Sequence, residues 1–182
     1  MKRVSEGSFV ANESKGPLVG VVLGSKSDLP VVGKGLEILE ELGIAYEVRI
    51  LSAHRTPDEA AAYAKSAGDR GLVAVIAAAG RAAHLPGVLA SHTLLPVIGV
   101  PVGGGPLSGV DALYSIVQMP SGIPVATMGI DGAANAALFA AQIVALVDRE
   151  AGERLAAWRR KRTEQSLADD RKAQESGWRS LL

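Results

Sequence analysis

Short apolar segments alternate with helix-forming segments along most of this 182-residue sequence, and this alternation restricts the fold more than any other feature. Each apolar segment has the length and composition of a strand, and each is followed by a helical pattern. Strands that alternate with helices at this spacing form βαβ units and a parallel sheet. We therefore expect a three-layer, doubly wound α/β domain. The predicted strands are Leu18–Leu23, Tyr46–Leu51, Leu72–Ala77, Pro96–Val100 and Pro124–Met128.

The α/β pattern covers residues 17–148, and both ends of the chain differ from it in composition. Residues 1–16 are polar and unpatterned, which predicts a flexible N-terminal tail. Residues 149–182 are charged and amphipathic, and predict a C-terminal helical extension that packs on a neighbouring subunit or on the flank of the domain. We expect a single flavodoxin- or Rossmann-like domain with a helical tail.

The segment Ala133–Val147 predicts a helix that is apolar on nearly every side. A helix of this kind is buried on more than one side, and one face of a sheet cannot cover it alone. We therefore expect contacts between subunits and a homo-oligomer.

Composition excludes several classes of function. Lys and Arg together number 19, as do Asp and Glu, so net charge gives no reason to expect nucleic acid as a partner. The absence of cysteine excludes disulfides, thiolate nucleophiles and thiolate metal sites. We find neither a signal-peptide pattern nor an apolar run of membrane-spanning length. We expect a soluble, cytoplasmic protein that binds no membrane.

Polar turns follow the first two predicted strands, at the position where open α/β sheets bind ligands. Ser52–Pro57 combines a hydroxyl, an imidazole and a guanidinium, with Thr56 as the predicted helix N-cap. Gly24–Asp28 offers hydroxyls and free amides at a helix start, which suit a phosphate, and Asp28 could accept from ribose hydroxyls. Either turn could equally be an ordinary capped turn. Neither matches the fingerprint of an NAD or ATP site.

Two of the three histidines belong to turns that should share one edge of the sheet. An imidazole in an anion-lined pocket can carry a proton near neutral pH, which makes His54 and His84 candidates. His84 also fits a structural role at a helix start, and His92 is interpreted as a packing or interface residue. Without paired carboxylates or ligand-like spacing, these histidines predict no metal site.

The glycine-rich segment Gly103–Pro106 follows the fourth predicted strand. Loops that are rich in glycine can move over a binding site, so this segment is a candidate lid. It is interpreted equally well as a simple connection between a strand and a helix.

Six motifs occur in series along the chain: Gly24–Asp28, Ser52–Pro57, Ala82–Gly87, Pro96–Val102, Tyr114–Pro120 and Asn135–Leu138. Together they resemble the PurE family of purine biosynthesis, over about residues 19–147. The bacterial branch of that family consists of N5-carboxyaminoimidazole ribonucleotide mutases, which move a carboxylate from the exocyclic nitrogen to ring carbon 4 by decarboxylation and recarboxylation. The resemblance implies this activity in IMP biosynthesis, without metal or cofactor, in a homo-octamer whose sites lie at subunit boundaries.

The same resemblance implies roles for individual residues. Ser25, Ser52 and Arg55 would bind the phosphate of the substrate, and Asp28 would bind the ribose hydroxyls. His54 would be the general acid and base that moves a proton as carbon dioxide leaves and adds again. The pocket for the base and the carboxylate would be lined by Ala79, Gly80, His84 and Leu85.

One loop departs from the mutase pattern. The mutases usually have Gly-Ala-Gly-Gly before Ala-Ala-His, whereas this sequence has Ala78-Ala79-Gly80-Arg81. Arg81 could pair with the substrate carboxylate, turn outward to a neighbouring subunit, or hinder binding. The branch that carboxylates aminoimidazole ribonucleotide directly with carbon dioxide tends to have Ala-Gly-Arg in this loop. That branch usually has Lys after its histidine, however, whereas this sequence has Arg55 after His54. Direct carboxylation is therefore the first alternative, and a non-catalytic nucleotide-binding homologue is the second.

Overall fold

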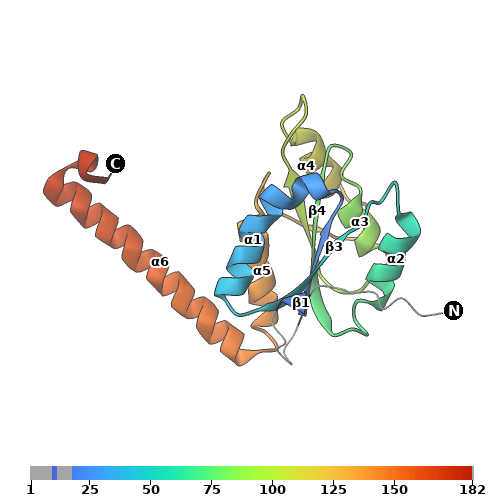
Figure 1. The fold of residues 1–182 in the computed structure, drawn as a ribbon, viewed down its shortest axis with the longest axis horizontal. Helices are drawn as coiled ribbons and strands as arrows, with labels where there is room; N and C mark the ends of the chain where they lie inside the picture. Colours follow the sequence, from blue (N-terminus) through green and yellow to red (C-terminus); the bar gives the residue numbers. More distant parts are fainter. Residues whose placement is uncertain (1–9, 12–17, 182) are drawn as a thin grey trace.

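A computed structural model describes residues 10–11 and 18–181 of the chain. These residues form a six-stranded sheet in the order β1-β3-β2-β4-β5-β6 (Figure 1). The strands from β2 to β6 are parallel, and β1 is antiparallel to β3. The parallel strand order is that of flavodoxin-like, doubly wound folds, so the predicted fold class is confirmed. The bounds are β1 Val10–Ala11, β2 Leu18–Leu23, β3 Ala45–Ile50, β4 Leu72–Gly80, β5 Val97–Val102 and β6 Ala126–Thr127.

Helices cover both faces of the sheet, as expected for three layers (Figure 1). One face is covered by α1 (Leu29–Glu41) and α5 (Ala133–Val144). The other face is covered by α2 (Pro57–Ser66), α3 (Leu85–Ala90) and α4 (Val110–Val117). The strands and helices lie where the sequence places them, although several helices end a few residues earlier than expected.

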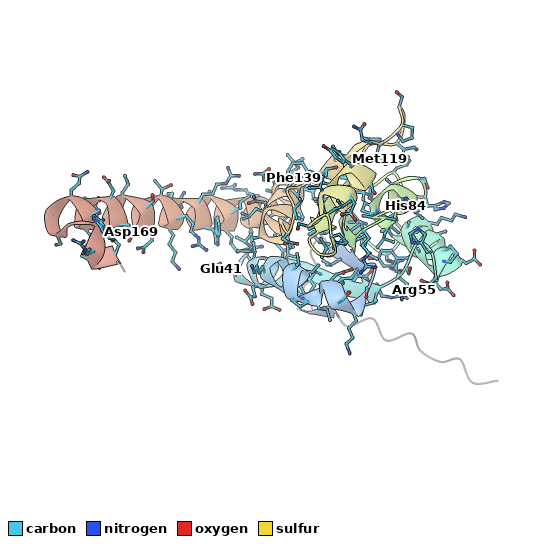
Figure 2. The ribbon with its side chains drawn as sticks, turned by 90° about the horizontal axis from the view of Figure 1, so that it is seen from above. Glu41, Arg55, His84, Met119, Phe139 and Asp169 are labelled. Atoms are coloured by element: carbon cyan, nitrogen blue, oxygen red, sulfur yellow. The ribbon has the colours of Figure 1, made fainter. Side chains whose placement is uncertain are left out.

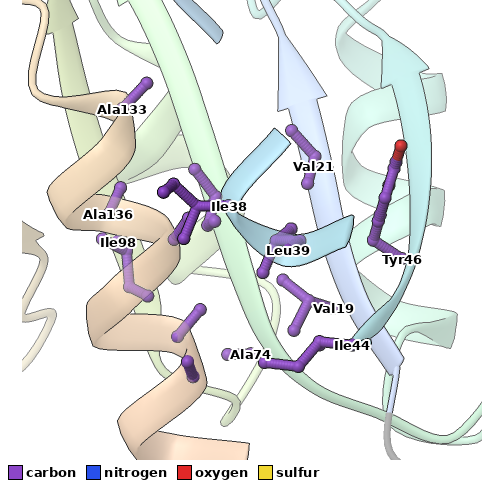
Figure 3. Close-up of a cluster of buried hydrophobic side chains, with 14 of the residues drawn as sticks. Val19, Val21, Ile38, Leu39, Ile44, Tyr46, Ala74, Ile98, Ala133 and Ala136 are labelled. Carbon is purple, nitrogen blue, oxygen red and sulfur yellow. The ribbon is translucent and has the colours of Figure 1, made fainter. Parts of the chain in front are cut away.

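Alternation along β2 divides its side chains between the two layers of helices. Val19, Val21 and Leu23 face α1 and α5, whereas Val22 faces the layer that contains α2. Figure 3 shows the first of these clusters, in which Ile38 and Leu39 of α1 meet the strands and the small side chains of α5. The strand is therefore buried on both faces, as its continuous apolar sequence predicts.

Helices α1 and α5 approach each other so closely that one position of α1 requires glycine. A Cβ atom on Gly35 would lie 2.7 Å from the backbone oxygen of Ala133, the first residue of α5. On the opposite side of the same helix, a Cβ atom on Gly33 would have no neighbour within 4 Å. The spacing of the two helices therefore depends on a missing side chain at Gly35 and not on flexibility of α1.

These two glycines form a matched pair for a stability measurement. Ala has a higher helix propensity than Gly, so Gly33→Ala should raise the free energy of unfolding by about 0.5–1 kcal/mol. Gly35→Ala receives the same benefit but forces α1 away from α5, and overpacking of this kind costs about 1–3 kcal/mol. Urea denaturation of both variants measures the difference. Equal effects of the two substitutions would contradict the packing argument.

The C-terminal residues form a long helix, α6 (Arg149–Ser176), followed by a short 3₁₀ turn at Trp178–Leu181. Its first turns pack on the flank of the domain, where Ala151 and Leu155 are buried. Arg154 Nε donates to the Leu42 oxygen at 2.7 Å, and Trp158 Nε1 donates to Glu41 at 2.9 Å. The rest of α6 extends away from the domain (Figure 1).

Helix α5 is buried by other elements of the same chain. The sheet, α1 and the start of α6 all contact it. Part of the burial for which the sequence predicts a second subunit is therefore provided by α6. Leu146 and Val147, just after α5, remain 83% and 67% exposed.

The predicted N-terminal tail, residues 1–16, lies mostly outside the described residues. At Val10–Ala11 the chain forms β1, which pairs with Tyr46 and Glu47 of β3. This pair adds one antiparallel strand to the edge of the parallel sheet.

Candidate active site

A cleft of about 670 Å³ lies at the carboxyl ends of four parallel strands. Residues from the loops after β2, β3, β4 and β5 line it. Between β2 and β4 the connections leave in opposite directions, since the chain passes from β2 to β3 on one side and from β4 to β5 on the other. Such a switch point is where doubly wound sheets bind ligands.

The structure brings every residue with a predicted role to this one cleft. The phosphate, ribose, proton-transfer and base-pocket residues all contribute to its lining, and their individual roles stay predictions. These lining residues are Ser25, Asp28, Ser52, His54, Arg55, Ala79, Gly80, His84 and Leu85.

Ser25 and Asp28 form a capping box around the single 3₁₀ turn η1 (Lys26–Asp28). Ser25 Oγ accepts from the Ser27 amide at 3.3 Å, while Asp28 Oδ2 accepts from the Ser25 amide at 3.0 Å. Burial raises the pKa of Asp28, and its hydrogen bonds and the charge of Arg55 oppose this rise. The turn therefore holds a poorly hydrated carboxyl group in the lining of the cleft, where a ligand hydroxyl can reach it.

The raised pKa of Asp28 has a consequence for stability. The unfolded chain loses this proton at lower pH than the folded chain, so ionisation disfavours folding once the pH rises above about 4. Asp28→Asn keeps a carbonyl oxygen as acceptor but carries no ionisable group. Its free energy of unfolding, relative to wild type, should therefore increase from pH 4 to pH 7, as measured by urea denaturation. A pH-independent difference would contradict the desolvation of Asp28.

Ser52 and Thr56 close the turn that carries His54 and Arg55. Ser52 Oγ accepts from the amides of His54 and Arg55, at 3.3 and 3.2 Å. Thr56 Oγ1 accepts from the Ser52 amide at 2.8 Å and donates to the Ser52 oxygen at 3.2 Å. Thr56 is the N-cap residue of α2, as predicted, but its side chain makes no capping hydrogen bond, because its hydroxyl bonds to the Ser52 backbone instead.

Arg55 connects the turn after β3 to the turn after β2. Its Nη2 donates to the Gly24 oxygen at 3.3 Å, and its Nε donates to Ser52 Oγ at 3.4 Å. The guanidinium and two serine hydroxyls therefore line one side of the cleft, where an anion would find several donors.

His54 and His84 contact each other across the cleft. His54 Nε2 lies 2.8 Å from His84 Nδ1, and the ring planes meet at 66°. A neutral imidazole has one donor and one acceptor nitrogen, so the tautomer of one ring determines that of the other. Which nitrogen of His54 carries the proton therefore depends on which nitrogen of His84 carries one. The sequence placed both residues at one edge of the sheet but did not predict this contact.

Asp131 anchors the start of the glycine-rich loop, and the sequence did not identify it. Its Oδ1 accepts from the Gly103 amide at 2.7 Å, and its own amide donates to the Pro101 oxygen at 2.8 Å. A Cβ atom on Gly103 would lie 2.7 Å from Asp131 Oδ2, which explains the glycine. The two residues are 28 positions apart, so no local pattern could have indicated the contact.

In residues 10–11 and 18–181, no group of three His, Asp or Glu side chains converges in a way that would hold a metal ion. Figure 2 shows Arg55 and His84 on the domain, whereas Asp169 lies far along α6. The cleft thus belongs to the α/β domain itself.

Fold and cleft together define a flavodoxin-like α/β protein whose cleft, at the carboxyl edge of its sheet, is lined by cationic, hydroxyl and imidazole groups. The family model "AIR carboxylase" matches residues 18–165. An N5-carboxyaminoimidazole ribonucleotide mutase of Pyrococcus horikoshii is 50% identical and aligns with 95% of this chain and 98% of its own length. The mutase of Escherichia coli K12 is 54% identical, over 82% of this chain and 89% of the relative. The chain belongs to the AIR carboxylase, or PurE, family.

Two further similarities agree with this membership. A phosphoribosylaminoimidazole carboxylase of Saccharomyces cerevisiae is 48% identical over 91% of this chain, but only over 29% of its own length. The crystal structure of Treponema denticola PurE superposes with a TM-score of 0.78 at 33% identity, and covers 86% of this chain and 98% of that one.

Proposed function

We propose that this protein converts N5-carboxyaminoimidazole ribonucleotide to 4-carboxy-5-aminoimidazole ribonucleotide in purine biosynthesis. Relatives that carry the mutase name are similar over nearly their whole length. The carboxylase name comes from a longer protein that this chain covers only in part, so it does not favour direct carboxylation. The observation that carries the proposal is the contact of His54 with His84 in the same cleft as Ser52 and Arg55.

We assign binding of the substrate phosphate to Ser25, Ser52 and Arg55. Support for this assignment comes from the contact of the Arg55 guanidinium with Ser52 Oγ and with the oxygen of Gly24, next to Ser25. These two contacts hold the guanidinium in the cleft, and a guanidinium binds phosphate oxygens through charge-assisted hydrogen bonds, which are stronger than neutral ones. Asp28, which lies in the same turn as Ser25, would accept from the ribose hydroxyls.

His54 would carry the single proton that the reaction needs. When the bond between the exocyclic nitrogen and the carboxyl carbon breaks, that nitrogen takes a proton and carbon dioxide is released. Ring carbon 4 then forms a bond to the carbon dioxide and loses its proton to His54. The protons balance, so one imidazole serves as both acid and base. This chemistry needs no metal or cofactor.

The apolar side of the cleft would retain the carbon dioxide between the two steps. Ala79 and Leu85 are 6% and 2% exposed and form part of the lining. Small and buried side chains exclude water, and they hold the gas near ring carbon 4. Gly80 and His84 would complete this pocket.

We further propose a cytoplasmic homo-octamer that binds no nucleic acid. Support for subunit contacts comes from large apolar side chains that are exposed on and after α4 and α5, because a subunit interface would remove this apolar surface from water. In the described part of the chain, no helix has the length and apolarity to cross a membrane. The exposed side chains include Tyr114, Val117, Phe139, Leu146 and Val147.

The direct test is a turnover assay of the purified protein, without added metal, with each of two substrates in turn. We expect conversion of N5-carboxyaminoimidazole ribonucleotide to the C4-carboxylated isomer, followed spectroscopically. Aminoimidazole ribonucleotide with bicarbonate should give little product. Turnover of only the second substrate would identify a direct carboxylase, and binding without turnover would identify a non-catalytic homologue.

His54→Asn should abolish turnover, with a loss of at least about 100-fold in kcat, because the amide cannot exchange a proton near neutral pH. Binding of aminoimidazole ribonucleotide should remain, since the phosphate donors are untouched. The matched control is His92→Asn, because His92 lies outside the cleft lining. Retained turnover in His54→Asn would remove this residue from the proton-transfer role.

A further inference from the structure

Arg81 lines the cleft in a backbone conformation that disfavours it. Its φ of 54° lies in the left-handed region, where glycine is the favoured residue. The turn that follows is tight, since the Ala83 amide donates to the Arg81 oxygen at 2.8 Å. Glycine would satisfy this turn without strain, so the backbone alone does not explain an arginine. Strain of this kind concentrates at functional sites.

The Arg81 side chain lies against the glycine-rich loop. Its Nε is 3.8 Å from the point that a Cβ atom on Gly105 would occupy. Among the described residues, no side chain forms an ion pair with Arg81 and no atom accepts a hydrogen bond from it. The cleft therefore holds a guanidinium with free donors.

Arg81 and Arg55 occupy different sides of the cleft. Arg55 donates to Gly24 at the end of β2, whereas Arg81 lies beside Gly105, in the loop after β5. β4 separates β2 from β5, and adjacent strands lie about 4.8 Å apart, so the ends of β2 and β5 are about 10 Å apart across the sheet. Two separated cations fit a ligand with two separated anionic groups.

We propose that Arg81 determines specificity by binding the carboxylate that the substrate carries in addition to its phosphate. This inference rests on the proposed function, in which substrate and product each carry one carboxylate on or beside the imidazole. Arg81 and His84 belong to the same loop, and both line the cleft that contains His54. A planar guanidinium can bind a carboxylate through two parallel hydrogen bonds.

The chemistry predicts how Arg81 affects the kinetic constants. The carboxylate becomes neutral carbon dioxide midway through the reaction, so Arg81 binds substrate and product more strongly than this intermediate. Interactions that favour the bound substrate over later states lower KM without raising kcat. Loss of Arg81 should therefore raise KM and leave kcat unchanged or higher.

Arg81→Gly, Arg81→Lys and the control Ser108→Gly test the proposal. Ser108 also has a positive φ, 49°, but lies outside the cleft lining, so it controls for glycine substitution. Calorimetry with aminoimidazole ribonucleotide and with its C4-carboxylated form measures the dissociation constants. Arg81→Gly should weaken binding of the carboxylated ligand by at least about tenfold, as expected for a lost charge-assisted hydrogen bond. Binding of the uncarboxylated ligand should be unchanged, and Arg81→Lys should restore part of the loss.

An equal loss for both ligands in Arg81→Gly, or no loss for either, would overturn the proposal. A decrease in kcat at unchanged KM would also overturn it. The proposed mutase activity is tested separately by turnover of the wild-type protein. If wild type fails to turn over, the ligand selectivity of Arg81→Gly still decides whether Arg81 binds a carboxylate. Failure of wild type to bind either ligand would refute both proposals.

Discussion

The parallel pairing of β2 with β3 on one side and β4 on the other is the interaction on which the rest of the structure depends. Backbone hydrogen bonds extend this pairing beyond the strands: the Leu51 amide donates to Leu23, and the Gly24 amide donates to Ala78. β2 and β3 consequently end at the same level, and β4 ends two residues further on. Their loops then meet in one cleft, although Ser25, Ser52 and Ala79 are far apart in sequence.

Small residues make this arrangement compact. Alanines on α5 and glycine at position 35 allow two helices to lie close together on one face of the sheet. On the other face, a Cβ atom on Gly20 of β2 would collide with Tyr63 of α2, so glycine lets the tyrosine ring lie over the strand. The composition, rich in Ala and Gly and only 4% aromatic, is thus a requirement of close packing between layers.

The polar groups that line the cleft include hydrogen-bond donors and a pair of imidazoles in contact. Arg55 with two serine hydroxyls forms one cationic side, and Arg81 forms another. The imidazoles of His54 and His84 share one hydrogen bond in the same cleft. In the proposed reaction this arrangement holds two anionic groups of one ligand while a proton moves between two of its atoms.

The order of strands and helices along the chain, the doubly wound fold and the loops that line the cleft could be predicted from the sequence. These properties follow from hydrophobic periodicity and turn residues, which act over a few neighbouring positions. Three features appear only in the folded chain: the contact between His54 and His84, the hydrogen bond from Gly103 to Asp131, and the close approach of two helices that requires Gly35. Thr56 is the N-cap residue of α2 as the sequence predicts, but only the structure shows that its hydroxyl bonds to the Ser52 backbone. The contacts at His84, Asp131 and Gly35 join residues about 30 or more positions apart, and they exist because the sheet places distant segments side by side.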